Sequence, residues 1–119
     1  MKVAVFLLLA SFASVSTIAM AADCHVDPYE FGVKGVPFDT AATMIVKSGT
    51  PCGSIVHTAF AHIEMRIARP AKNGIASTTG SDRWGYRSRP GFVGSDSFVV
   101  AIKGDRGTSN VSVTVNVTQ

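Results

Sequence analysis

The stretch Val111-Ser112-Val113-Thr114-Val115-Asn116-Val117 has valine at every second position and a polar residue between each pair. Side chains of a β-strand alternate between its two faces, so this pattern predicts a strand with one apolar and one polar face. Valine is β-branched and favours extended backbone. The stretch therefore predicts a half-buried strand that packs on a core and faces water on its other side.

Shorter runs of the same character lie upstream, separated by turn residues. They occupy residues 29–33, 43–47, 63–67, 83–89 and 98–102. In the run 83–89, Trp84 and Tyr86 share one face, whereas the arginines share the opposite face. Asn73-Gly74 is a turn signal that favours a hairpin. About seven short strands with turns between them predict an all-β, two-sheet antiparallel β-sandwich.

The segment 54–69 fits two periodicities. Ile63, Met65 and Ile67 share one face of a strand. The spacing of the apolar residues is also compatible with an α-helix that begins after Ser54 and ends before Pro70. Periodicity alone does not decide between them. We prefer two strands, because the segment contains β-branched residues and further strand-like runs follow it.

The composition is that of a globular chain. Of the 119 residues, 46% are hydrophobic and 16% are charged, which excludes a disordered or collagen-like protein. The formal charge of +3 is too small for a strongly basic nucleic-acid binder. The length leaves room for one small domain.

The first residues have the features of a secretory signal peptide. Lys2 supplies a positive charge, an apolar run occupies residues 3–9, and Ala19-Met20-Ala21 ends the segment. We expect cleavage after Ala21, with Ala22 as the alternative, so that 1–21 is a signal peptide and 22–119 is the mature domain. No later segment is long and apolar enough to cross a bilayer. We therefore expect a periplasmic or extracellular protein whose mature chain does not insert into a membrane.

Two cysteines, Cys24 and Cys52, allow one disulfide at most. Export into an oxidising compartment favours this bond. The alternative is a metal site formed by Cys24, His25, Cys52 and His57, although their spacing matches no standard zinc pattern. We favour the disulfide and expect no metal and no other cofactor.

Recognised catalytic motifs are absent from the sequence. The three histidines accompany no Gly-x-Ser-x-Gly, His-Glu-x-x-His or glycine-rich phosphate loop. Asp82, Asp96 and Asp105 lie beside glycine or turn residues, where capping a turn is more common than acid–base catalysis. A domain this small also rarely forms a deep cleft. We therefore expect a non-enzymatic protein.

Three pieces of the C-terminal half carry a family resemblance: Pro70-Ala71-Lys72-Asn73-Gly74, the segment 86–98, and the valine stretch that ends at Val117. Over residues 67–118 the chain resembles the bacterial Ig-like (cadherin-like) domains of secreted proteins. The most specific piece is Pro90-Gly91-Phe92-Val93-Gly94-Ser95-Asp96-Ser97-Phe98. The resemblance implies an Ig-like antiparallel β-sandwich, a scaffold that serves adhesion, spacing or binding without a shared active site.

Each residue of this motif has a structural interpretation. Pro90-Gly91 forms a turn, Phe92 folds over the end of the sandwich, and Phe98 enters the core. Gly94 allows a backbone conformation that a Cβ would obstruct. The Asp96 carboxylate accepts backbone N–H groups of the turn. The motif is thus expected to build the fold rather than an active site.

Arg83, Arg87 and Arg89 form the best candidate binding surface in the sequence. Strand alternation places them on one face, with the guanidinium groups of Arg87 and Arg89 about 7 Å apart. Such groups are suited to phosphates or carboxylates. The simpler interpretation, which we favour, is a solvated outer face that Asp82 and Asp96 partly neutralise.

These observations predict a secreted or periplasmic, non-enzymatic Ig-like module that binds through a sheet face, an edge strand or the N-terminal arm. The expected partner is an envelope protein or an anionic envelope polymer rather than nucleic acid. The alternative is a small periplasmic metal-handling protein that uses Cys24, His25 and Cys52. The sequence leaves the identity of the partner and the oligomeric state open.

Overall fold

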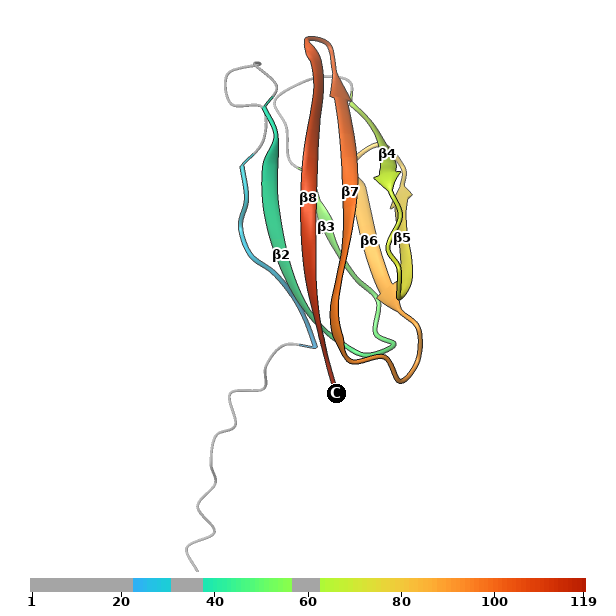
Figure 1. Cartoon of the computed structure of the whole chain (residues 1–119). Coiled ribbons are helices and arrows are strands. Elements are labelled where there is room, and N and C mark those ends of the chain that lie inside the picture. Colours follow the sequence, from blue (N-terminus) through green and yellow to red (C-terminus); the bar gives the residue numbers. More distant parts are fainter. Residues whose placement is uncertain (1–22, 31–37, 57–62) are drawn as a thin grey trace, which may run out of the picture.

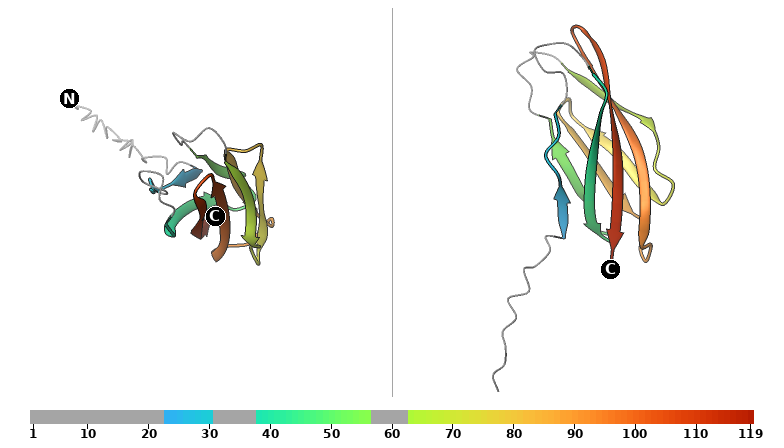
Figure 2. Two further views of the ribbon diagram at one scale, coloured as in Figure 1. Left: turned by 90° about the horizontal axis from the view of Figure 1, so that it is seen from above. Right: turned by 60° about the vertical axis from the view of Figure 1, so that its left-hand side comes forward.

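The computed structural model of the chain describes residues 23–30, 38–56 and 63–119. These residues form an all-β structure of two sheets packed face to face (Figures 1 and 2). The predicted signal peptide, 1–21, lies outside the described residues. The strands described are β1 (Cys24–Val26), β2 (Thr40–Lys47), β3 (Cys52–Ile55), β4 (Glu64–Arg69), β5 (Gly74–Thr79), β6 (Arg83–Ser88), β7 (Gly94–Gly104) and β8 (Gly107–Thr118).

The larger sheet has the strand order β1-β2-β8-β7-β4, and the smaller sheet has the order β3-β6-β5. Neighbouring strands are antiparallel except β2 and β8, which run parallel from Thr40 beside Val111 to Lys47 beside Thr118. The expectation of a wholly antiparallel sandwich is therefore wrong at this pair. A parallel pair needs a long crossover, and the chain supplies one because it passes through the second sheet between β2 and β8.

β7 and β8 form a long hairpin inside the larger sheet. Val111, Val113, Val115 and Val117 are buried, and the polar residues between them face outward. The predicted half-buried strand is thus confirmed. Phe98 of β7 is fully buried opposite Val113. Burial of each such side chain is worth roughly 1.5–3 kcal/mol relative to exposure, so this hairpin supplies much of the core.

Trp84 and Tyr86 of β6 point inward, as their shared face predicted, and pack on Phe98. The ring centroids of Trp84 and Phe98 lie 5.6 Å apart in an edge-on arrangement, and those of Tyr86 and Phe98 lie 5.7 Å apart in a stacked one. Trp84 Nε1 donates a hydrogen bond of 2.8 Å to Tyr29 Oη. Tyr29 itself lies outside any strand, so its predicted place in a strand is wrong, and residues 31–33 of that run lie outside the described residues.

Strands occupy the described ends of segment 54–69, as the preferred interpretation predicted. β3 ends near its start, and in β4 Met65 and Ile67 pack against the core while Glu64 is exposed. Residues 57–62 lie outside the described residues. In the parts of the chain that the structure describes, no helix is long and apolar enough to cross a membrane.

The turn at Asn73-Gly74 does not form the predicted hairpin. β4 pairs with β7 in the larger sheet, whereas β5 pairs with β6 in the smaller one, so the chain crosses between sheets after Arg69. The N–H groups of Lys72 and Asn73 donate to the Asp96 carboxylate instead of to a neighbouring strand. The Asp96 side chain thus provides hydrogen-bond acceptors for the backbone of the crossing. The residues of the turn alone do not reveal this distant acceptor.

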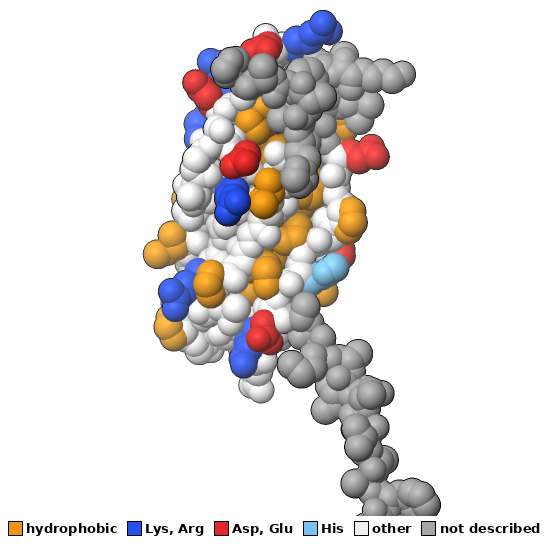
Figure 3. Space-filling model, turned by 180° about the vertical axis from the view of Figure 1, so that it is seen from behind, with side chains coloured by type: hydrophobic (Ala, Val, Ile, Leu, Met, Phe, Trp, Pro, Cys, Tyr) orange, Lys and Arg blue, Asp and Glu red, His pale blue; other side chains and the backbone are white. Residues whose placement is uncertain are grey.

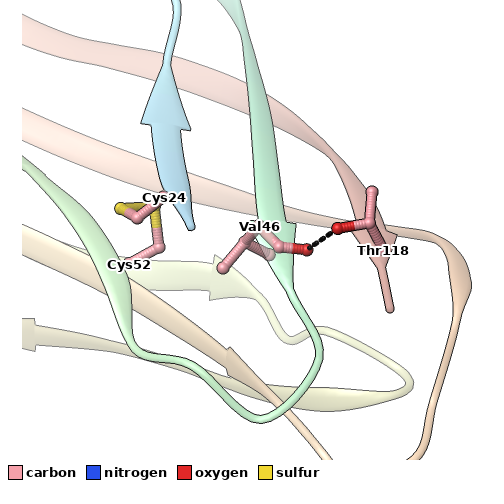
Figure 4. The surroundings of a disulfide bond; sticks show 4 residues. All are labelled: Cys24, Val46, Cys52 and Thr118. Atoms are coloured by element: carbon pink, nitrogen blue, oxygen red, sulfur yellow. Dashed lines mark hydrogen bonds between the residues drawn. A yellow bond between two sulfur atoms is a disulfide. The ribbon is translucent and has the colours of Figure 1, made fainter. Parts of the chain in front are cut away.

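Cys24 and Cys52 form the predicted disulfide, with their Cα atoms 5.3 Å apart. It joins β1, at one edge of the larger sheet, to β3, at one edge of the smaller sheet (Figure 4). Next to it, Lys47 N donates a hydrogen bond of 2.9 Å to Asp23 O. The N-terminal strand is thereby attached to both sheets.

Candidate functional site

The outer face of the smaller sheet brings together residues from β3, β6 and β5. In the strand register, Gly53 lies beside Gly85, and Gly85 lies beside Ser77. This row crosses the whole sheet, and the largest side chain in it is the hydroxymethyl group of Ser77. The outer face therefore has a floor of nearly bare backbone at its centre.

Larger side chains flank this floor on both sides. One flank holds Ile55, Arg83 and Thr79, which are aligned across the three strands. The other flank holds Arg87 beside Ile75. Floor and flanks form an open groove of about 1080 Å³. Figure 3 views the molecule from this side and shows arginine or lysine side chains and separate hydrophobic side chains standing on a mostly pale surface.

Two isoleucines of the flanks are unusually exposed. The exposed fraction is 44% for Ile55 and 74% for Ile75. Neither was among the predicted binding residues, and neither were the glycines of the floor. Alternation within each strand could have placed each of them on an outer face, but the groove exists only through the register of three strands.

Glycine at position 53 is required by the close approach of β3 and β6. A Cβ on Gly53 would lie 2.4 Å from the carbonyl oxygen of Trp84. A Cβ on Gly85 would lie 3.3 Å from the carbonyl oxygen of Cys52, which is tight but much less so. The floor of the groove therefore depends on the backbone spacing that Gly53 permits.

We expect Gly53→Ala to lower the free energy of unfolding by about 1–2 kcal/mol, because the added methyl group must push β3 away from β6. Urea unfolding of the purified variant measures the change. Gly85→Ala is the matched control and should lose clearly less stability. Wild-type stability in Gly53→Ala would contradict the close approach of the two strands.

The three predicted binding arginines have different settings. Arg83 and Arg87 are exposed on β6, about 13 Å apart along the strand. Arg87 Nε donates a hydrogen bond of 2.9 Å to the carbonyl oxygen of Gly49. Arg89 follows the end of β6, and its guanidinium group lies 5.6 Å from the ring centroid of Phe92. Arg83 and Arg87 thus share the outer face of β6, and Arg89 lies beyond the strand but lines the same groove.

Asp96 is buried, and its carboxylate accepts four hydrogen bonds. Lys72 N and Ser97 N donate to Oδ1 at 3.0 and 2.9 Å. Asn73 N and the Tyr86 hydroxyl donate to Oδ2, both at 2.9 Å. Asp96 accepts backbone N–H groups as expected, but the turn that it caps is the crossing between β4 and β5 rather than the turn after Pro90.

These contacts shift the pKa values of the Asp96 carboxyl group and the Tyr86 hydroxyl group in opposite directions. Burial alone would raise the pKa of Asp96, but its three backbone N–H donors and the Tyr86 hydroxyl lower it below the ordinary value. Burial, followed by the hydrogen bond to Asp96 and the charge of Asp96, raises the pKa of Tyr86. Because every strong acceptor site of the carboxylate is occupied, Asp96 acts as a structural anion.

The other motif residues build the end of the sandwich. Pro90 and Gly91 form a turn, Phe92 is partly buried against the core, and Phe98 is fully buried. Gly91 and Gly94 have φ angles of 83° and 139°, which favour glycine. A Cβ on Gly94 would meet the Phe92 ring at 3.5 Å, an ordinary contact. The backbone conformation, which a Cβ would disfavour, therefore accounts for Gly94, as predicted.

Within the described ranges, no group of three or more His, Cys, Asp or Glu side chains could hold a metal ion. His25 Nε2 lies 2.8 Å from Asp27 Oδ1 on the surface. His57 and His62 lie outside the described residues. Both cysteine sulfurs are in the disulfide, so the metal-handling hypothesis requires that this bond first be reduced.

Comparisons with known proteins do not assign the chain to a family. No family model matches the sequence, and no curated protein matches it. Structures of an endo-fucoidan hydrolase of glycoside hydrolase family 107 and of a variant of this enzyme are similar to 63% and 67% of the chain, at 14% and 13% identity and TM-scores of 0.46 and 0.45. The chain spans about 12% of the length of these enzymes.

Proposed function

We propose that this chain is a secreted, non-enzymatic Ig-like binding module whose groove on the smaller sheet binds an acidic segment of a protein partner. The observation that carries the proposal is the backbone floor of the groove, flanked by Arg83 and Arg87. Export through the predicted signal peptide, 1–21, would deliver the module to the periplasm or the extracellular space. The disulfide suits such an oxidising compartment.

The strand order supports the Ig-like part of the proposal. If β2 to β8 are lettered A to G, the smaller sheet contains B, E and D, and the larger sheet contains C, F and G. These are groupings of the immunoglobulin fold. Strand A then pairs with G, and β1 is an additional edge strand.

The two arginines suit carboxylate ligands. Guanidinium groups bind carboxylates through paired, charge-assisted hydrogen bonds. The guanidinium group of Arg83 makes no hydrogen bond or ion pair with any residue that the structure describes, and that of Arg87 makes one hydrogen bond, through Nε. An extended peptide along the floor would present successive side chains to opposite flanks, one toward Arg83 and the next toward Arg87. Acidic residues at such positions would meet both guanidinium groups.

The exposed isoleucines favour a polypeptide over a polysaccharide. Ile55 and Ile75 offer apolar contacts of the kind that side chains of a bound peptide fill. Sugar rings instead pack their C–H faces on exposed aromatic rings. The aromatic residues that line the groove, Trp84 and Tyr86, are turned inward and buried. The groove thus resembles a peptide site more than a saccharide site.

Titration of the mature protein with a polyglutamate peptide, followed by amide chemical shifts, tests this function. We expect shifts at Gly53, Ser77 and Gly85, and weaker binding as the salt concentration rises, because salt screens exposed charges. Reversing both charges, in Arg83→Glu/Arg87→Glu, should weaken binding about tenfold or more, because like charges then face the ligand.

The matched control reverses two charges elsewhere. Lys103→Glu/Arg106→Glu changes the net charge equally, at exposed positions of the hairpin between β7 and β8. This variant should keep the wild-type affinity within about twofold. Equal weakening by both double variants, or an absence of shifts in β3, β5 and β6, would contradict the groove as the binding site.

A further inference from the structure

The edge strand β5 lacks the features that keep sheet edges from pairing. Its six residues, Gly-Ile-Ala-Ser-Thr-Thr, include no charge and no proline, and it is an outer strand of the smaller sheet. Natural edges are usually short, charged, bulged or interrupted by proline, because an unprotected edge pairs with another strand. The exposed Ile75 adds an apolar side chain to this edge.

The other edges that the structure describes are protected. β1 and β3 have only three and four residues and are joined by the disulfide. β4 carries Glu64, Arg66 and Arg69 and has a register shift near its end. β4 and β5 lie on the same side of the sandwich (Figure 1). On that side, the edge of the larger sheet is charged and the edge of the smaller sheet is not.

We propose that β5 pairs in antiparallel fashion with β5 of a second copy of this chain, about a two-fold axis at Ser77. Directly opposed residues of an antiparallel pair lie on the same face. Ile75 and Thr79 are both on the outer face, so a register that opposes Ile75 to the partner's Thr79 keeps both outer faces together. The two three-stranded sheets then form one continuous sheet of six strands.

The charges at the two ends of β5 are complementary in this register. Lys72 lies just before the strand and Asp82 lies in the turn after it, and both are exposed. The axis at Ser77 brings the Lys72 end of each copy to the Asp82 end of its partner. Opposite charges therefore meet at both ends of the β5–β5 pair, which we call the β5 seam, and no like charges oppose each other along it.

The same register continues the groove from one copy to the next. Ser77 ends the floor of one copy and lies beside the partner's Ser77, so the floor continues onto the partner's Gly85. The flank with Arg83 and Thr79 continues with the partner's Ile75. The paired copies would share one groove of twice the single length. The pairing itself follows from β5, and only the use of the longer groove rests on the proposed function.

Sedimentation equilibrium of the mature protein over a range of concentrations tests the pairing. We expect a mass of two chains at the higher concentrations. Ser77→Lys places two like charges face to face at the axis and should give a mass of one chain. Thr114→Lys makes a similar exposed change on β8 and should remain dimeric. The proposal would be overturned if the wild type had the mass of one chain at every concentration, or if a single chain bound a strand of another protein at β5. It would also be overturned if Ser77→Lys remained dimeric.

Two further sets of variants test the register. Ser77→Cys should form a covalent dimer under mild oxidation, because the two new thiols lie directly opposite each other, whereas Thr114→Cys should not. Lys72→Glu and Asp82→Lys should each weaken the dimer, and the combined exchange should restore it. Cross-linking of Thr114→Cys alone, or no restoration by the exchange, would overturn this register.

The proposed dimer and the proposed peptide binding can be tested separately. Arg83→Glu/Arg87→Glu should weaken peptide binding about tenfold or more but leave the mass of two chains unchanged, because neither arginine lies on β5. A dimer that binds no polyglutamate would keep the pairing and reject the proposed function. Loss of the dimer in Arg83→Glu/Arg87→Glu would instead overturn the β5 seam.

Discussion

Replacing both cysteines with alanine should lower the free energy of unfolding of the mature protein by about 3.5 kcal/mol. Cys24 and Cys52 are 28 positions apart in the sequence, so without the bond the unfolded chain regains the conformational entropy of that loop. Alanine is preferred to serine because Cys52 is buried, where an added hydroxyl would need a partner. Urea unfolding of the double variant and of the oxidised wild type measures the difference.

The loss should be concentrated at the N-terminal edge of the larger sheet. β1 has only three residues, too few to stay paired with β2 on their own. The amide of Lys47, which donates to Asp23 O, should therefore exchange with solvent much faster in the variant. Val113, inside the sheet, is the internal control, and its exchange should change only as much as global stability does. Unchanged protection at Lys47 would show that the disulfide does not hold β1.

The strands were predictable where burial follows a simple period within one segment. The valines of β8 and the inward pair Trp84 and Tyr86 are examples, because alternation reports directly which side chains face the core. The connections were less predictable. Asn73-Gly74 has the same local chemistry whether the chain returns within one sheet or crosses to the other. The crossing depends on Asp96, which accepts the N–H of Asn73 from 23 residues away in the sequence.

The candidate site was predictable only in part, for the same reason. Arg83 and Arg87 are four residues apart on one strand, so alternation alone places them on one face. The floor between them comes from Gly53, Gly85 and Ser77, which belong to three different strands. No pattern within a single strand reveals that these positions align. Grooves of this kind become visible only when the register between strands is known.

Asp96→Asn should lower the free energy of unfolding by about 3 kcal/mol, because it removes a buried charge that holds four hydrogen-bond donors. The new amide can still accept bonds at its oxygen, and the Tyr86 hydroxyl can turn to accept from its nitrogen. The N–H of Asn73 has no such freedom and would face another donor. The crossing between β4 and β5 would then lose its anchor to β7.

The matched control for this variant is Asp105→Asn. It makes the same chemical change in the exposed turn between β7 and β8, and its effect should stay within about 0.5 kcal/mol. Urea unfolding of both variants at neutral pH gives the comparison. Similar losses in Asp96→Asn and Asp105→Asn would mean that the four donors do not depend on the carboxylate.

The difference in the free energy of unfolding between the wild type and Asp96→Asn should become smaller in acid. The pKa of Asp96 is lower in the folded protein than in the unfolded chain, where the pKa of an aspartate is about 3.9. Its ionisation therefore stabilises the fold above that pH, and the stabilisation is lost as the pH falls through the folded pKa. Asparagine does not titrate, so the gap in unfolding free energy should be constant from neutral pH to about pH 5 and should narrow below about pH 4. A gap that stays constant into strong acid would show that the contribution of Asp96 does not depend on its charge.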